Sequence, residues 1–441
     1  MEVKMNSIRW SLVTLLTLTS GLMATDSLAD AFKEGTTSGQ IRTFYIDRTY
    51  TGVVENNRNS LAIGGNLGFE TAPINGVSIG TKFYTTNGLD LHSGAKSSAN
   101  YDPSLFGDGF DSYSMVGEAY INYKQENTNI KIGRQKLNTP LAGADDARML
   151  PNLFEAVVLS NTSLKDTTLI GAHVTRESVG TFGNVYGTPS QLSLQSGYGL
   201  GYKEATNGHF SDMGVVALGA DTDTVGVTAL AGIYKGIPNV TLQAWDYYAH
   251  DILNAVYLQG DYGFNLGATK LKASAQYINQ SDTGDKLAGE VDGQYVGAKL
   301  GTTVGALSGY VAYSTTDSSN SATANGGVIT PWGGIPAFTQ GMVTRHMFLA
   351  DTDTSKVALT YNFKDTGADV KATAYYASFD VGAKNTYKEN QAWTAKESGF
   401  DIQYNPANIK NLNLRLRANY PTDFAPGLDW SEYRLIANYN F

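Results

Sequence analysis

Arginines that recur at every second position near the C-terminus are the clearest candidates for chemistry in this chain. Arg415 and Arg417 alternate with leucines in the segment 412–420, and Arg434 lies opposite aromatic and apolar residues in the segment 433–441. Burying such a row in a dry core would be costly, whereas a water-filled interior accepts it. Guanidinium groups beside water can bind carboxylates by charge-assisted hydrogen bonds that are weak enough to release.

Other chemistry finds little support in the sequence. The five histidines show no i, i+4 pair and no His-Glu-x-x-His motif, and there is no cysteine. The Asp-Thr-Asp-Thr segments at 221–224 and 351–354 lack the ligand spacing and final glutamate of a calcium loop. A Ser-His-Asp set can assemble in space without a local motif, but nothing in the sequence indicates one. We therefore expect no enzyme activity, no catalytic residue, no metal and no cofactor.

The elements that must position these arginines are strands with a period of two residues. Five segments show this pattern, with apolar residues on one face and polar residues on the other: 256–265, 271–277, 357–363, 412–420 and 433–441. Segments of roughly ten residues match a tilted strand that crosses a membrane. The sequence after the first thirty residues has no apolar run long enough for a membrane-spanning helix. Besides helices, a closed barrel can cross a membrane, because it pairs every backbone N–H and C=O within the protein.

The connections between these strands alternate in length. Short turns at 364–369 and 405–410 alternate along the chain with long polar stretches, of which 315–352 is the longest. Short periplasmic turns opposite long external loops are typical of outer-membrane barrels, and the length of the chain corresponds to about 16 to 18 strands. We therefore predict an all-β fold, a transmembrane antiparallel β-barrel of bacterial outer-membrane type with about 18 strands.

The N-terminal segment has the features of an export signal. Lys4 and Arg9 precede an uncharged stretch from Trp10 to Met23, and Ser27-Leu28-Ala29 offers a processing site with small residues. We expect residues 1–29 to be a signal peptide and residues 30–441 to form one barrel domain. The net charge of −9 argues against binding to nucleic acid.

Two stretches resemble the OprD-type family of substrate-selective porins. The segment Ile41-Arg42-Thr43-Phe44-Tyr45-Ile46-Asp47-Arg48 looks like the first-strand pattern of that family. The residues from Ala144 to Glu155 are similar to its Asp-Asp-x-Arg-Leu-Leu-Pro-x-x-Phe stretch, and 164–169 follows in the same way. The resemblance runs from the predicted mature N-terminus to the final strand, although 178–254 matches only as a generic barrel.

The resemblance implies an 18-stranded barrel whose third external loop folds inward as a constriction, with a ladder of basic residues along the wall. Asp145, Asp146 and Arg148 fall in the constriction-loop position. The ladder positions are matched by Arg42, Arg48, Arg415, Arg417 and Arg434, and alternation alone adds Lys131 to the inner face. Arg134 shares parity with Ile130 and Ile132, so it lies at a rim or beside a bulge and is left out of the ladder.

The expected function is passive uptake of small polar solutes through a water-filled channel in the outer membrane, with a preference for carboxylate-bearing compounds such as amino acids or organic acids. Two interpretations of the basic residues stay open, because solvated lumen charges can also tune an unselective pore. Asp145 and Asp146 either form an acidic lip opposite the basic wall or stabilise turns within the loop. The alternative function is a structural or adhesive surface protein that acts through its external loops.

The expected partners are small solutes, outer-membrane lipid and the barrel-insertion machinery. Tyr439 and Phe441 lie on the lipid-facing side of the last strand, where they resemble the terminal signal that this machinery reads. The sequence leaves open whether the protein is a monomer or a homotrimer.

Overall fold

The computed structural model describes residues 27–91, 95–97, 99–185, 207–219, 221–267, 269–388 and 390–441. Residues 1–26 of the predicted signal peptide lie outside this part of the chain. Helix α1 (Leu28–Lys33) spans the predicted processing point after Ala29, and the Ser27 side chain accepts a hydrogen bond from the backbone N–H of Asp30. Strands and their connections make up nearly all of the described chain that follows.

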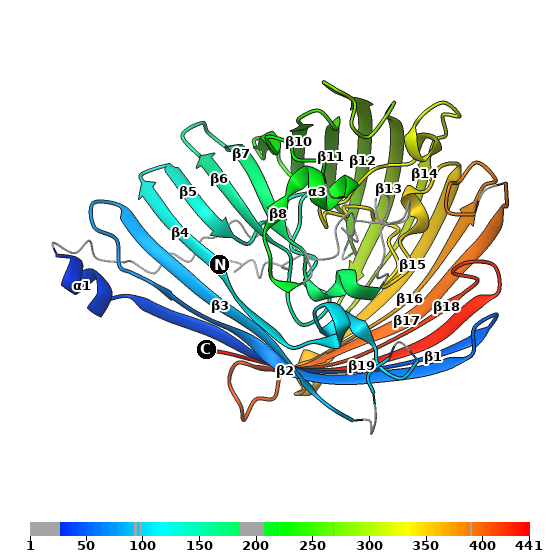
Figure 1. Cartoon of the computed structure of the whole chain (residues 1–441), viewed down its shortest axis with the longest axis horizontal. Helices are drawn as coiled ribbons and strands as arrows, with labels where there is room; N and C mark the ends of the chain where they lie inside the picture. The colour runs from blue at the N-terminus through cyan, green and yellow to red at the C-terminus, as the bar shows by residue number, and fades with distance from the viewer. Residues whose placement is uncertain are drawn as a thin grey trace.

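Antiparallel strands form one continuous sheet in which strands that follow each other in the sequence lie side by side. The strands are β1 (Thr36–Gly52), β2 (Asn56–Glu70), β3 (Val77–Leu89), β4 (Tyr113–Gln125), β5 (Thr128–Gln135), β6 (Leu153–Asn161), β7 (Thr167–Ser178), β8 (Ser211–Asp212), β9 (Val227–Tyr234), β10 (Val240–Ala249), β11 (Leu253–Leu266), β12 (Thr269–Asp282), β13 (Asp292–Val304), β14 (Leu307–Thr316), β15 (Thr352–Asn362), β16 (Val370–Val381), β17 (Trp393–Tyr404), β18 (Leu412–Thr422) and β19 (Leu428–Asn440). Figure 1 shows them following one another around the wall, with blue β1 beside red β19.

Pairing between the first and last strands closes the sheet. β1 and β19 pair from Gln40 opposite Asn440 to Gly52 opposite Leu428. The two-residue strand β8 pairs with the end of β7, whereas β7 and β9 pair along the wall between 167–174 and 227–234. The described residues therefore form a closed antiparallel barrel of 18 wall strands, which confirms the predicted fold.

The two faces of the wall follow the predicted alternation. On β19, Tyr433 and Leu435 are 42% and 53% exposed and point outward, as does Phe441 directly after the strand at 48%, whereas Glu432 and Arg434 point inward and are fully buried. This arrangement holds because a barrel in a membrane presents apolar side chains to lipid and polar ones to its interior. In the described residues, no helix is both long and apolar enough to span a membrane.

The connections differ in length at the two ends of the barrel. At the end that carries both termini they are short turns, such as 126–127 and 305–306, where Glu126 and Gly305 adopt positive φ. At the other end, long connections join β3 to β4, β5 to β6, β7 to β9 and β14 to β15. The short helices are α3 (Met213–Leu218), η1 (Pro103–Leu105), η2 (Asp108–Phe110), η3 (Thr181–Val185), η5 (Thr323–Gly326), η6 (His346–Phe348) and η7 (Phe363–Thr366). All of them except η7 lie in long connections.

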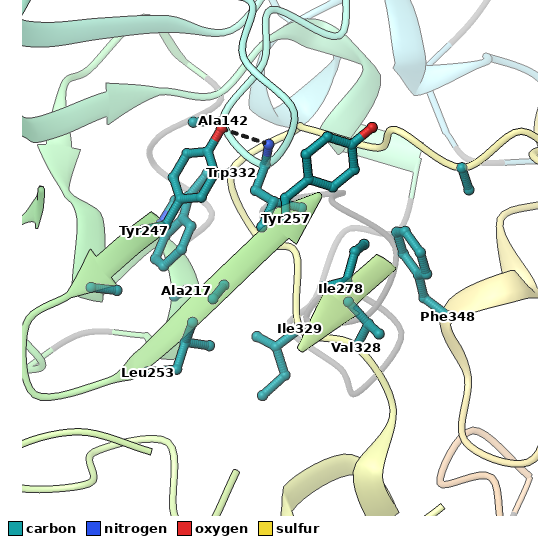
Figure 2. Packing of buried hydrophobic residues seen from close by; sticks show 14 of the residues in the cluster. Ala142, Ala217, Tyr247, Leu253, Tyr257, Ile278, Val328, Ile329, Trp332 and Phe348 are labelled. Carbon is teal, nitrogen blue, oxygen red and sulfur yellow. Dashed lines mark hydrogen bonds between the residues drawn. The ribbon is translucent and has the colours of Figure 1, made fainter. Parts of the chain in front are cut away.

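The described residues of three of these long connections pack inside the barrel. We call them the constriction loop (136–152), the α3 loop (residues 179–185, 207–219 and 221–226) and the η6 loop (317–351). Their buried apolar side chains form one cluster with inward-facing wall residues. Figure 2 shows wall residues Tyr247 and Tyr257 beside Trp332 of the η6 loop and Ala142 of the constriction loop.

Backbone and side-chain hydrogen bonds join the three loops to one another. The Gly143 N–H donates to the Trp332 carbonyl at 2.9 Å, and the Trp332 indole Nε1 donates to the Met213 carbonyl at 3.0 Å. The inward-folded constriction loop that the resemblance implied is therefore present, and it is held by the α3 and η6 loops as well as by the wall. Because these loops fill part of the lumen, they decide which wall residues reach water.

Candidate functional site

Alternation along the strands places every predicted basic wall residue on the inner face. Each shares its face with buried side chains such as Phe44 and Ile46, whereas neighbours such as Ile41 point outward. The inward-facing residues are Arg42 and Arg48 on β1, Lys131 on β5, Arg415 and Arg417 on β18, and Arg434 on β19. Their surroundings nevertheless differ, and they fall into a buried group and a water-facing group.

The buried group surrounds the carboxylate of Glu432. Arg48 Nη2 lies 2.6 Å from Glu432 Oε2, while Arg148 Nη2 and Arg434 Nε each lie 3.0 Å from Oε1. The side chains of these three arginines are at most 2% exposed. An ion pair so deeply buried is a structural element whose disruption would leave a charge without a partner. Arg148 belongs to the constriction loop, so this network ties that loop to the wall.

A second carboxylate, Asp102 beside η1, completes the buried network. Arg48 Nη1 lies 3.0 Å from Asp102 Oδ2, and Arg58 Nε lies 3.6 Å from the same oxygen. Burial alone would raise the pKa of Asp102, but Arg48 and Arg58 outweigh it and lower that pKa below its usual value. Burial lowers the pKa of Arg148 to about 10, which still leaves its guanidinium charged at neutral pH.

Arg42 and Asp146 form a more accessible contact between the wall and the constriction loop. Arg42 Nη1 lies 2.7 Å from Asp146 Oδ1, and Lys136 Nζ lies 3.4 Å from Oδ2. The side chains of Asp146 and Lys136 are 32% and 43% exposed, whereas that of Arg42 is 10% exposed. Burial raises the pKa of Asp146, but the two cations outweigh this effect and lower it. The trio has two positive charges and one negative charge, so it can attract an anion.

Asp145 faces a different partner from its neighbour. Its two carboxylate oxygens accept hydrogen bonds of 2.8 Å from Nη1 and Nη2 of Arg345, a residue of the η6 loop. This bidentate pair is nearly buried and joins the constriction loop to the η6 loop. The sequence did not point to Arg345, because the residue lies in an irregular loop where alternation carries no information.

Arg415 and Arg417 share one carboxylate on the neighbouring strand. Arg415 Nε donates to Asp401 Oδ1 at 2.7 Å, and Arg417 Nε lies 3.6 Å from Asp401 Oδ2. The side chains of Arg415 and Arg417 are 30% and 17% exposed, so both keep access to water. This group also carries one net positive charge at the lumen surface.

Lys131 lies apart from these arginines, on the inner face of β5. Its ammonium group is 3.5 Å from the centre of the Tyr120 ring, which is a cation–π contact. On neighbouring strands, Lys82 and Glu118 form a pair at 3.7 Å. Lys131 therefore extends the basic surface beyond the arginine sector without taking part in its ion pairs.

Further basic residues on the inner wall were missed by the sequence analysis. Lys272, Lys299 and Lys356 lie on β12, β13 and β15, where they face inward. Lys272 pairs with Asp261 at 3.1 Å, and Lys299 lies 4.0 Å from the centre of the Phe338 ring in the η6 loop. The same alternation that identified Arg415 could have identified them, since each lies in a regular strand next to an outward-facing apolar residue such as Leu300 or Val357.

The two residues of the predicted assembly signal lie on the outer face at the end of β19. Phe441 exchanges backbone hydrogen bonds of 2.8 and 3.0 Å with Gly39, and its ring centre lies 6.4 Å from that of Tyr439. Both rings are exposed on the surface that faces lipid in a membrane barrel. Their accessibility is compatible with recognition by another protein during assembly.

Within the described residues, no group of three or more His, Cys, Asp or Glu side chains is arranged to hold a metal ion. The site can act on a solute through its charged side chains. Cations outnumber the carboxylates in the Arg42 and Arg415 groups, and the contacts of the partly exposed Lys136, Arg415 and Arg417 can exchange with a passing anion.

Comparison with known proteins identifies the family. The family model described as "outer membrane porin, OprD family" matches residues 30–441. None of the curated protein sequences matches the chain. Among solved structures, OccK9 (OpdG) of Pseudomonas aeruginosa is similar with 20% identity and a TM-score of 0.75, over 93% of this chain and 99% of that one.

Two further porins are similar over the same shares of the two chains. P. aeruginosa OpdK, in a structure with vanillate, has 18% identity and a TM-score of 0.73, and a BenF-like porin from Pseudomonas fluorescens Pf-5 has 17% and 0.73. At such identities these structures show a shared fold, and the family model adds the sequence relationship. The chain is therefore a member of the OprD family of outer membrane porins, integral to the bacterial outer membrane as a closed β-barrel.

Proposed function

We propose that this porin favours small solutes that carry a carboxylate. The observation that supports this preference is the net positive charge of the water-facing groups, in which Arg42 and Lys136 share Asp146 while Arg415 and Arg417 share Asp401. An anion that enters the lumen can replace a carboxylate on one of these cations and then be released, because each contact is partly solvated.

The similar structures are compatible with such a preference. OpdK was crystallised with vanillate, which is an aromatic carboxylate. The lysines Lys272, Lys299 and Lys356 add cationic groups elsewhere on the inner wall. Family and fold are those of channels and not of enzymes, and they favour a channel over an adhesive surface protein that uses the barrel only as an anchor.

The buried arginines have a different role in this proposal. Arg48, Arg148 and Arg434 position the constriction loop and set the local field, while Arg415, Arg417 and Lys131 contact solutes. Arg42, whose side chain is 10% exposed, adds its positive charge beside Asp146 and Lys136. Asp146 acts as the acidic lip opposite the basic wall, and Asp145 holds the η6 loop. A buried residue can bind a passing solute only if the side chains packed around it move away.

Uptake by reconstituted protein tests the proposal. Liposomes that contain the porin are given monocarboxylates, neutral sugars and amines of similar size, and swelling rates are compared at low ionic strength. Monocarboxylates should enter fastest and amines slowest. Equal rates for the three classes would instead establish an unselective pore.

Two proposals concern export and assembly. We infer that residues 1–29 direct export and are removed, and that Phe441 with Tyr439 is read by the barrel-insertion machinery. The residues between Trp10 and Met23 have the apolar character of an export signal, and Phe441 ends the outward face of β19. Mass spectrometry of the protein from outer membranes tests the first inference, since it would give Asp30 as the N-terminal residue.

A further inference from the structure

A row of charged residues crosses the outer face of the barrel where β5, β6 and β7 reach the long loops. Arg134, Glu155 and Arg176 lie opposite one another in the sheet register. Their neighbours Ile132 and Val157 are 50% and 43% exposed on the same outer face. The structure thus places Arg134 at an outward-facing rim, one of the two positions that its parity allowed.

The two arginines keep much of their hydrogen-bonding capacity. Arg134 Nε lies 2.9 Å from Glu155 Oε1 and Arg176 Nη1 lies 3.8 Å from Glu155 Oε2, so one carboxylate serves two guanidinium groups. The side chains of Arg134 and Arg176 are 40% and 57% exposed. Each guanidinium has five N–H donors, and most of them point to no carboxylate. Arg134, Glu155 and Arg176 together therefore carry one net positive charge outside the lumen, and Asp212 of β8 lies opposite Arg176.

Two histidines that share the hydroxyl of Thr228 as a hydrogen-bond partner continue the row along the same rim. The Thr228 hydroxyl lies 3.0 Å from His173 Nδ1 and 3.0 Å from His250 Nε2. His173 shares the outer face of β7 with Arg176, and it lies opposite Val157 of β6 and Thr228 of β9. Imidazole N–H groups can donate to an anionic oxygen, so the polar rim extends over β5, β6, β7, β9 and the end of β10.

Directly below this rim, the outer surface contains an apolar hollow. It is lined by Leu169, Leu230, Gly232, Ala244 and Val256, together with Asp246. The hollow exists because Gly171 and Gly232 have no side chains, and a Cβ at either position would meet only a leucine methyl at 3.7–3.9 Å. Acyl chains fit such a surface, since it offers apolar contact and no hydrogen-bonding partner except at its edge.

Long loops of an outer-membrane barrel face the exterior, so the rim lies at the level of the headgroups of the external leaflet. We propose that the rim formed by Arg134, Arg176, His173 and His250 binds the phosphate of an anionic lipid of that leaflet, whose acyl chain occupies the hollow beneath. The site lies outside the channel and is independent of the solutes that the channel carries.

Negative charge on this part of the wall does not prevent such binding. On the described strands β5 to β10, the outward-facing carboxylates are those of Glu155, Asp212 and Asp246. Asp212 lies opposite Arg176, but its Oδ1 accepts hydrogen bonds from the backbone N–H groups of Gly214 and Thr224 at the start of α3. Glu155 is already shared by both arginines, and Asp246 lies on β10, two wall strands from Arg176. A phosphate group therefore meets guanidinium groups whose neighbouring carboxylates are already engaged, Glu155 by the two arginines and Asp212 by α3.

Titration of the purified barrel in neutral detergent with lipid A, followed by native mass spectrometry, tests the site. The double variant Arg134→Gln/Arg176→Gln should weaken lipid A binding by about 30-fold, because each arginine near a charged lipid surface raises the affinity by a factor of about five to six. The control Lys165→Gln/Lys235→Gln removes the same charge from turns at the opposite end, and its binding should match the wild type. Single-channel conductance of both variants should also match it.

Three outcomes would overturn the proposal. The first is unchanged binding by the arginine variant, or equal loss in the lysine control. The second is equal binding of dephosphorylated lipid A by the wild type, which would leave only the apolar hollow as the determinant. The third is displacement of lipid A by millimolar inorganic phosphate, which would indicate a site for free phosphate. The second and third measurements use only the wild type, so they hold even if the variant fails to fold.

Discussion

The group formed by Arg415, Arg417 and Asp401 offers the sharpest test of anion preference. The double variant Arg415→Gln/Arg417→Gln keeps side chains of similar length and changes the local charge from +1 to −1, because Asp401 stays in place. A carboxylate that passes about 7 Å from this group in a water-filled lumen interacts with each unit charge by about 0.6 kcal/mol. A change of two charges is therefore about 1.2 kcal/mol, or about an eightfold change in occupancy.

The assay compares uptake of a monocarboxylate and a neutral sugar of similar size by liposomes at low ionic strength. Monocarboxylate uptake should fall about eightfold while sugar uptake stays nearly constant, and added salt should reduce the difference because it screens the charges. The control Lys165→Gln/Lys235→Gln, which removes two charges outside the lumen, should leave both rates unchanged. An equal fall for both solutes would refute the reasoning, since it would indicate a narrowed pore instead of a lost charge.

Three other predictions concern the stability of the site and its assembly. Glu432→Gln leaves three buried guanidinium groups around an uncharged amide, so it should lower the free energy of unfolding in urea by about 3 to 5 kcal/mol. Burial lowers the pKa of His346 to about 4, so the η6 loop should be fully stable above pH 6.5 and lose up to about 3 kcal/mol as the pH falls to 4. Amide exchange of residues 340–350 checks this loss, which His346→Phe should abolish. Deletion of Phe441 should reduce the folded, heat-modifiable protein in outer membranes, and normal amounts would contradict its role in assembly.

The His346 prediction depends on where its side chain lies. The ring is fully buried in the η6 loop, and Nε2 lies 2.6 Å from the Phe424 carbonyl. Rings of Phe379, Tyr387 and Trp393 surround it at 5.8–6.1 Å between centres. A second proton would place a charge among these rings, so the folded loop binds that proton more weakly than the unfolded loop does.

The fold could be predicted from the sequence because a barrel wall is governed by local rules. Each strand alternates between a lipid-facing and an inward-facing side, and this pattern is visible along a few residues at a time. Alternation therefore gave the correct faces for Arg415, Arg417 and Lys131 without knowledge of any neighbour. The same rule applied to β12, β13 and β15 would have identified the lysines that were overlooked.

Access to water was decided by the tertiary structure. Arg415 and Arg434 occupy the same inward face, yet the first is partly exposed and the second is fully buried. The difference arises because the constriction loop covers β19 and brings Arg148 to Glu432, a contact between residues 284 positions apart. Alternation reports the direction of a side chain and contains no information about what lies in front of it.

The ion-pair partners of Asp145 and Asp146 also depend on tertiary contacts that the sequence pattern does not reveal. The sequence indicated an inward loop with acidic residues, but the Asp145 pair with Arg345 joins positions 200 apart, and Asp146 turns instead to Arg42 on β1. By itself the sequence determined the barrel, its family and the faces of its strands, since these follow from short-range periodicity and a local motif. Only the folded loops decided which charges are neutralised and which remain for a solute, because those pairings depend on contacts between distant segments.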